Sequence, residues 1–193
     1  MKRTLSLILS LVMLLSITAG LNLTAKAETE MGKCGENVTY SLDSSTGELT
    51  ISGTGNMDNY NYYDDDYSPF FYYHDIKTIT INSGVTSIGD GAFESCENLT
   101  SVTIPDSVTS IGWGAFVGCA SLISVTISDN VTSIGDSAFY DCTSLASISV
   151  EENNKNYSST DGILFDKGKT TLIKCPQASA ITEYTIPNSV TSI

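Results

Sequence analysis

The side chains that could do chemistry in this chain of 193 residues are few, and none of them forms a recognisable catalytic group. His74 is the only histidine, and no motif places a nucleophile and a carboxylate beside it, as a Ser–His–Asp site requires. The sequence also has no phosphate-binding loop and no paired-carboxylate motif. We therefore predict that the chain is not an enzyme and that it holds no cofactor.

Three of the five cysteines, Cys96, Cys119 and Cys142, recur at intervals of 23 residues. A residue that recurs in a core pattern is most simply a small buried hydrophobe, which is how free cysteine behaves. Cys34 and Cys175 lie outside this series, and the sequence leaves open whether they form a disulfide. Because there is no CxxC motif and only one histidine, no metal site is predicted.

Acidic residues gather in one segment, at Asp58 and at residues 64–66. Hard cations prefer several oxygen ligands, but the DxDxDG spacing of a Ca²⁺ loop is absent, so we expect a solvated acidic loop. The whole chain has a net charge of −13, which argues against nucleic acid and anionic membrane surfaces as partners.

Two features indicate binding rather than catalysis. Trp113 stands where neighbouring repeats have aspartate, which predicts a solvent-facing tryptophan, a residue type enriched at interaction hot spots. The alternative is that its ring lies flat over a neighbouring coil. Rows of exposed hydroxyls could order water or contact a glycan, although threonine is also common on strands simply because of its propensity. The candidate partner-binding residues are Trp113, Thr80, Ser101, Thr103, Ser124, Thr126 and Ser149.

A 23-residue repeat must position these side chains. The sequence Val-Thr-Ser-Ile-Gly occurs at 85–89, 108–112 and 131–135, and an Ala-Phe pair keeps the same step. Fixed spacing of this length is typical of a solenoid, in which each coil buries its apolar edge against its neighbours. We expect Phe93, Phe116 and Phe139 to stack on one another.

Each coil is predicted to contain two extended segments and one turn. Residues 99–104 alternate apolar and polar side chains, as a half-buried strand does, and Pro105 then turns the chain. Residues 108–111 form a second extended segment. Ala115 to Cys119 predicts a short helical turn back to the next coil.

The chain is predicted to have three parts, which are a signal peptide (1–27), an N-terminal β cap with an aromatic and acidic loop (28–75), and repeats (76–193). We divide the repeats into 76–98, 99–121, 122–144, 145–180 with a hairpin insertion, and a truncated copy at 181–193. The last copy stops in mid-coil, which predicts a piece of a longer protein or a degraded gene.

Residues 1–27 have the pattern of a secretory signal peptide. Lys2 and Arg3 precede an apolar run that is too short for a convincing membrane span, and Ala25-Lys26-Ala27 matches a small-x-small cleavage site. We expect cleavage near Ala27, secretion or display at the cell surface, and no membrane insertion afterwards. Removal of these residues, which hold three basic and no acidic side chains, takes the net charge from −13 to −16.

Residues 28–75 do not repeat. Residues 37–53 predict a β-hairpin whose turn is Asp43-Ser44-Ser45-Thr46-Gly47. A solenoid end exposes an apolar cross-section that needs a cap. We therefore expect this segment to cover the first coil, with Phe70, Phe71 and some tyrosines over it.

The pattern of Leu99 to Cys119, Leu-x-x-Val-x-Ile-Pro-x-x-Val-x-x-Ile-Gly-x-x-Ala-Phe-x-x-Cys, resembles the BspA-type leucine-rich repeat of bacterial surface and secreted proteins. Cys34-Gly35 with residues 47–55, and the hairpin at 161–165, are similar to segments of the same family. The resemblance implies a β-rich leucine-rich-repeat solenoid with a parallel sheet, an N-terminal β-hairpin cap and no catalytic residues.

The same resemblance implies a recognition or adhesion protein that binds host-matrix or other cell-surface proteins through its sheet. Two alternatives stay open. The chain could be a structural or targeting module of a larger secreted enzyme, or its surface could bind carbohydrate through Trp113.

Overall fold

The computed structural model describes residues 29–61 and 64–193, which form fourteen strands. The signal peptide predicted at 1–27 lies outside the described residues. The first seven strands are β1 (Thr29–Lys33), β2 (Val38–Asp43), β3 (Glu48–Gly53), β4 (Gly55–Asn56), β5 (Thr78–Ile81), β6 (Val85–Ile88) and β7 (Ser101–Thr103). The others are β8 (Ser110–Ile111), β9 (Ser124–Ile127), β10 (Ser133–Ile134), β11 (Ser147–Val150), β12 (Tyr157–Thr160), β13 (Ile163–Asp166) and β14 (Leu172–Lys174).

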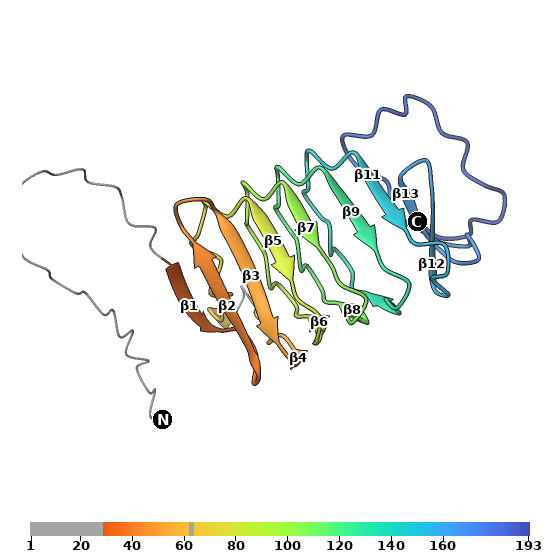
Figure 1. Cartoon of the computed structure of the whole chain (residues 1–193). Helices are drawn as coiled ribbons and strands as arrows, with labels where there is room; N and C mark the ends of the chain where they lie inside the picture. Colours follow the sequence, from red (N-terminus) through yellow and green to blue (C-terminus); the bar gives the residue numbers. More distant parts are fainter. Residues whose placement is uncertain (1–28, 62–63) are drawn as a thin grey trace, which may run out of the picture.

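Two sheets run along the repeats. The first has the order β1-β2-β3-β5-β7, antiparallel from β1 to β3 and parallel from β3 to β7. The second has the order β10-β8-β6-β4 and is parallel throughout. Strands β9 and β11 form a separate parallel pair that lies beside β7 in Figure 1. The parallel sheet expected along all the repeats is therefore interrupted between β7 and β9.

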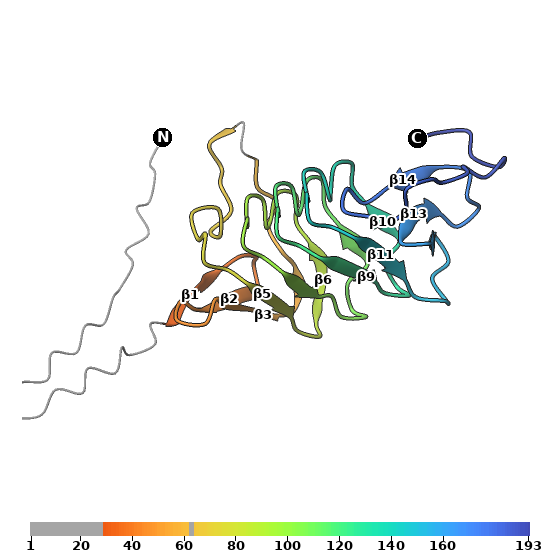
Figure 2. The same ribbon diagram turned by 90° about the horizontal axis from the view of Figure 1, so that it is seen from above.

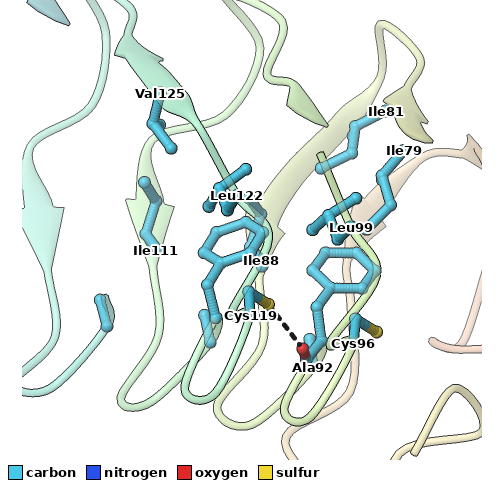
Figure 3. Close-up of a cluster of buried hydrophobic side chains, with 14 of the residues drawn as sticks. Ile79, Ile81, Ile88, Ala92, Cys96, Leu99, Ile111, Cys119, Leu122 and Val125 are labelled. Atoms are coloured by element: carbon cyan, nitrogen blue, oxygen red, sulfur yellow. Dashed lines mark hydrogen bonds between the residues drawn. The ribbon is translucent and has the colours of Figure 1, made fainter. Parts of the chain in front are cut away.

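The core is a stack of identical side chains from successive repeats (Figure 3). The rings of Phe93, Phe116 and Phe139 stack at centroid distances of 5.4 and 5.6 Å, which confirms the stacking predicted from the repeat. Phe70, which lies 23 residues before Phe93, extends the stack by one ring at 5.5 Å. All four rings are at most 3% exposed. Stacked apolar surface of this kind is the main favourable contribution to folding.

The segment that closes each repeat is a series of tight turns, not the short helix predicted at 115–119, and the described residues contain no α-helix. In the first turn (residues 89–96), Ala92 donates its N–H to the Gly89 carbonyl three residues earlier, at 3.3 Å. The intervening N–H groups donate at 2.8 Å to the next turn: Gly91 to Trp113, Phe93 to Ala115 and Ser95 to Val117. Since an α-helix would need these donors for its own carbonyls, the stacking of repeats excludes one.

This alternation requires a left-handed backbone at regular positions. In the second turn (residues 112–119), φ is +58° at Gly114 and +71° at Gly118. Ser95 and Asp141 occupy the position of Gly118 in the neighbouring turns, with φ of +61° and +57°. Glycine adopts this conformation freely, whereas another L-residue crowds its Cβ against the backbone.

The glycine that ends each Val-Thr-Ser-Ile-Gly motif sets the spacing between repeats. A Cβ on Gly112 would lie 2.5 Å from the Asp90 nitrogen, and one on Gly135 would lie 2.5 Å from the Trp113 nitrogen. Real Cβ atoms do not approach that closely, so these glycines are required by backbone contact between coils.

The first repeat contacts residues that precede it in the chain. Strands β2 and β3 form the predicted antiparallel hairpin, and β3 pairs in parallel with β5. The N–H of Tyr60 donates to the Asp90 carbonyl at 2.8 Å, and the buried Ser68 hydroxyl donates to the Ala92 carbonyl at 2.5 Å. These two donors replace those that a preceding repeat would supply.

Strands β12, β13 and β14 form a three-stranded antiparallel sheet that follows β11. Figure 2 shows it beyond β11, at the end of the row of coils opposite β1. Thr191 and Ser192 both donate to the Thr170 carbonyl, as Thr132 and Ser133 do to that of Thr109. The repeat therefore resumes after the insertion, with Thr170 in the position of Thr109.

We predict that Phe116→Ala lowers the free energy of unfolding by about 3–5 kcal/mol, because it removes a ring from the middle of the stack and leaves a cavity. Chemical denaturation followed by circular dichroism measures the change. Tyr140→Ala, at a side chain that is 63% exposed, is the control and should change stability little. An equal effect of the two substitutions would contradict the stacked core.

Ser95→Gly should raise the free energy of unfolding by about 1 kcal/mol, because it relieves the left-handed strain at this position. The same denaturation experiment tests it. Ser83→Gly, at an exposed position outside the left-handed region, should give no gain. A loss of stability in Ser95→Gly would show that the Ser95 side chain contributes more to the free energy of unfolding than its left-handed φ angle costs.

Candidate interaction surfaces

The six hydroxyl residues predicted from the sequence lie on the solvent side of the first-sheet strands and of the β9–β11 pair. We call them the hydroxyl face: Thr80, Ser101, Thr103, Ser124, Thr126 and Ser149. All six are exposed, and strand register places Thr80 beside Thr103 and Thr126 beside Ser149. The structure thus brings them together in two patches, one on β5 and β7 and one on β9 and β11.

The hydroxyls of this face are not used in the fold. None of the six makes a side-chain hydrogen bond to another residue in the part of the chain that the structure describes. Elsewhere, threonine hydroxyls bond the preceding coil: Thr109 donates to the Thr86 carbonyl at 3.1 Å and Thr132 to the Thr109 carbonyl at 3.1 Å. The hydroxyl face therefore presents free donors and acceptors to an incoming molecule.

Trp113 lies apart from the hydroxyl face, beside the second sheet. It is 42% exposed, and its backbone N–H donates to the Asp90 carboxylate at 2.7 Å. It lines an open groove of about 450 Å³, which we call the tryptophan groove and which no residue of the hydroxyl face lines. The two kinds of candidate residue therefore define two separate surfaces.

Polar residues of the tryptophan groove were not identified from the sequence. Register aligns Asn56, Ser87, Ser110 and Ser133 along β4, β6, β8 and β10, and all four line the groove with Asn59 and Asp90. Three of them could have been predicted, because the 23-residue spacing of the Val-Thr-Ser-Ile-Gly motif places Ser87, Ser110 and Ser133 side by side. Asn56 and Asn59 precede the repeats, so no periodicity pointed to them.

The three repeat cysteines, Cys96, Cys119 and Cys142, are buried thiols. All five are free, and Cys34 is buried near the first strands whereas Cys175 is exposed after β14, so the pairing left open by the sequence is not formed. The Cys119 thiol donates to the Phe93 carbonyl at 3.2 Å (dashed line in Figure 3), and the Cys142 thiol to that of Phe116 at 3.2 Å. Burial raises the pKa of Cys96 to about 12, so it stays protonated.

The remaining chemical candidates do not form a site. His74 is exposed, and its backbone carbonyl accepts a hydrogen bond from the Asn98 amide at 2.6 Å. Asp64 accepts a bond from the Asn61 amide at 2.6 Å, within the acidic loop. In the ranges 29–61 and 64–193, no group of three His, Cys, Asp or Glu side chains could hold a metal ion.

Taken together, strand-rich coils of 23 residues with a leucine, isoleucine and phenylalanine core define the leucine-rich repeat class. The profile of the BspA type leucine rich repeat region matches residues 67–179, in six copies. The chain belongs to this family. The family profile and the solved structures indicate no enzymatic family, and a comparison with curated proteins gave no match.

Solved structures show a similar fold. The chain is 30% identical to a leucine-rich repeat protein from Eubacterium ventriosum, with a TM-score of 0.50, over 84% of this chain and 55% of that one. A leucine rich cell surface protein from Faecalibacterium prausnitzii has 20% identity and a TM-score of 0.60, over 87% of this chain and 66% of that one. The chain thus spans less than two thirds of either relative. Among the described residues, no helix is long and apolar enough to cross a membrane.

We predict that a thiol reagent at pH 8 modifies one cysteine of the five in the native protein. Cys175 is the exposed thiol, whereas burial holds the repeat cysteines in the unreactive protonated form. Mass spectrometry after alkylation, with and without denaturant, measures the count and the position. Rapid native labelling of Cys119 would contradict the buried thiol stack.

Proposed function

We propose that this protein is a non-catalytic recognition or adhesion protein, exported by residues 1–27, that binds protein partners through the hydroxyl face. The observation that carries the proposal is the set of six exposed hydroxyls without side-chain bonds, held in register on stacked strands. A rigid sheet that presents ordered polar groups can bind without first losing conformational entropy. Membership of a family that includes a cell surface protein supports an extracellular setting.

The segment at 28–75 supports this role as a cap. Its Tyr60 and Ser68 donors and its Phe70 ring close the first repeat in the way that a further repeat would. A closed end keeps an exposed apolar cross-section from associating with other chains. The hydroxyl face is then the surface that remains for specific contacts.

The tryptophan groove favours a second candidate, carbohydrate binding. An exposed indole beside the serines and asparagines of this groove matches what a sugar needs, an apolar platform with hydrogen-bonding groups next to it. The acidic net charge of −13 favours neutral or basic ligands over anionic polysaccharides on this surface.

The double substitution Thr103→Glu with Thr126→Glu should weaken binding to a protein ligand at least about tenfold, because bulky charged side chains obstruct close contact. Surface plasmon resonance on immobilised fibronectin, fibrinogen and mucin, with bacterial polysaccharides in parallel, measures the change. Thr182→Glu with Thr185→Glu is the matched control, since both threonines are exposed and lie outside the hydroxyl face. It carries the same added charge.

The variant Trp113→Ala distinguishes the two candidates. Protein binding that is lost in the Thr103/Thr126 variant and kept in Trp113→Ala supports the hydroxyl face. Glycan binding lost in Trp113→Ala alone supports the tryptophan groove instead. A folded protein that binds none of these ligands would overturn both.

A further inference from the structure

The third turn (residues 135–142) leaves donors unused that the first two turns use. In the second turn, the N–H groups of Gly114, Phe116 and Gly118 donate to the carbonyls of Asp136, Ala138 and Tyr140, at 2.9 to 3.1 Å. The equivalent donors of the third turn are Ser137, Phe139 and Asp141. No described residue accepts a hydrogen bond from any of these three N–H groups.

A groove of about 470 Å³ lies along this row of donors. Ser137 and Phe139 line it, together with Ile134 and Ala138 on the repeat side. Leu172, Ile173 and Ile193 line it on the side of the inserted sheet. Asp136, Tyr140, Thr171, Lys174 and Ser192 also line it, so the groove is partly apolar and partly polar. Ser137 and Asp141 are exposed, whereas Phe139 is 3% exposed. A buried donor without an acceptor is unfavourable.

The fourth repeat does not supply carbonyl acceptors for these three N–H groups, although its strand β14 lies beside the third repeat. The hydrogen bonds of Thr191 and Ser192 to Thr170 put Leu172 in the position of Ile134. The segment from Leu172 to Ile181 is two residues shorter than that from Ile134 to Leu145, and it has Pro176 in place of the Ala-Phe pair. Figure 1 shows the chain after β14 extending away in a wide loop.

A second copy of the chain is a poor occupant of this groove. The turn carbonyls that it would offer at its own N-terminal end are those of the first repeat. Asp90 already accepts from Tyr60, and Ala92 from Ser68. A segment whose carbonyls have no donor yet is therefore the better occupant.

We propose that this groove, which we call the third-turn groove, binds an extended peptide of a partner protein through its main chain. Three alternate carbonyls of the peptide accept from Ser137, Phe139 and Asp141, which continues the hydrogen bonding between the first and second turns. Its intervening side chain enters the groove against Leu172 and Ile173, as Phe116 enters between the Ala115 and Val117 carbonyls that accept bonds from the first turn. Such main-chain addition gives affinity from backbone bonds and selects by the side chain that enters. This site is separate from the hydroxyl face, so either proposal can fail alone.

The probe is the capped heptapeptide Gly-Trp-Gly-Ala-Phe-Val-Gly, the sequence of residues 112–118, which forms the same bonds inside the fold. Amide hydrogen exchange of the ¹⁵N-labelled protein is measured by NMR with and without peptide. Without peptide, the Ser137, Phe139 and Asp141 amides should exchange faster than those of Gly114, Phe116 and Gly118. Saturating peptide should slow the exchange of these three amides at least about tenfold and leave the exchange rates of the second-turn amides unchanged.

Ile173→Glu should weaken peptide binding at least about tenfold, because it replaces one of the apolar side chains of the groove by a charged one. Ile123→Glu is the matched control, since Ile123 is 55% exposed, Ile173 is 37% exposed, and only Ile173 lines the groove. A scrambled peptide of the same composition should not protect the amides. Equal binding by both variants, or binding without protection of the three amides, would overturn the proposal.

Protection of the same amides without peptide would also overturn it. If that protection grew with protein concentration, the occupant would be a second copy. If it did not depend on concentration, another part of this chain would cover the donors.

Discussion

The structure depends on how each closing turn divides its backbone N–H groups between itself and the next repeat. One donor in two stays within the turn, and the other crosses to a carbonyl of the following turn, as from Phe93 to Ala115. An isolated repeat cannot satisfy these groups, and unsatisfied backbone donors in a core are unfavourable. The repeats therefore stabilise one another in pairs, and a cap or a partner is needed wherever the series is interrupted.

Most other features follow from this division. Left-handed residues appear at Gly114 and Gly118, two of the positions whose N–H groups cross to the following turn. The glycines at 112 and 135 permit the backbone approach that these bonds require. With the coils held this close, phenylalanine rings stack at about 5.5 Å in the core, and the other side of the strands faces solvent.

The sequence predicted much of the fold and part of the surface. The 23-residue step identified the stacked phenylalanines, the buried cysteines and the hydroxyl rows, because periodic residues occupy equivalent places in equivalent coils. The prediction of a helical turn at 115–119 was wrong, because local helix propensity does not take account of N–H groups that bond to the next repeat. The parallel sheet is interrupted between β7 and β9. The tryptophan groove was missed in part because two of its polar residues, Asn56 and Asn59, lie outside the repeat.

The sequence by itself determined the class of protein, the period of its coils and which side chains face inward. Those properties are local and are repeated, so each copy reinforces the same pattern. Only the tertiary structure decided which backbone donors are satisfied. The unused N–H groups of Ser137, Phe139 and Asp141 depend on the shorter turn after β14, more than thirty residues downstream. A hydrogen bond between coils joins two segments that are far apart in the sequence. The composition of one segment does not show whether the other lies close enough to bond to it.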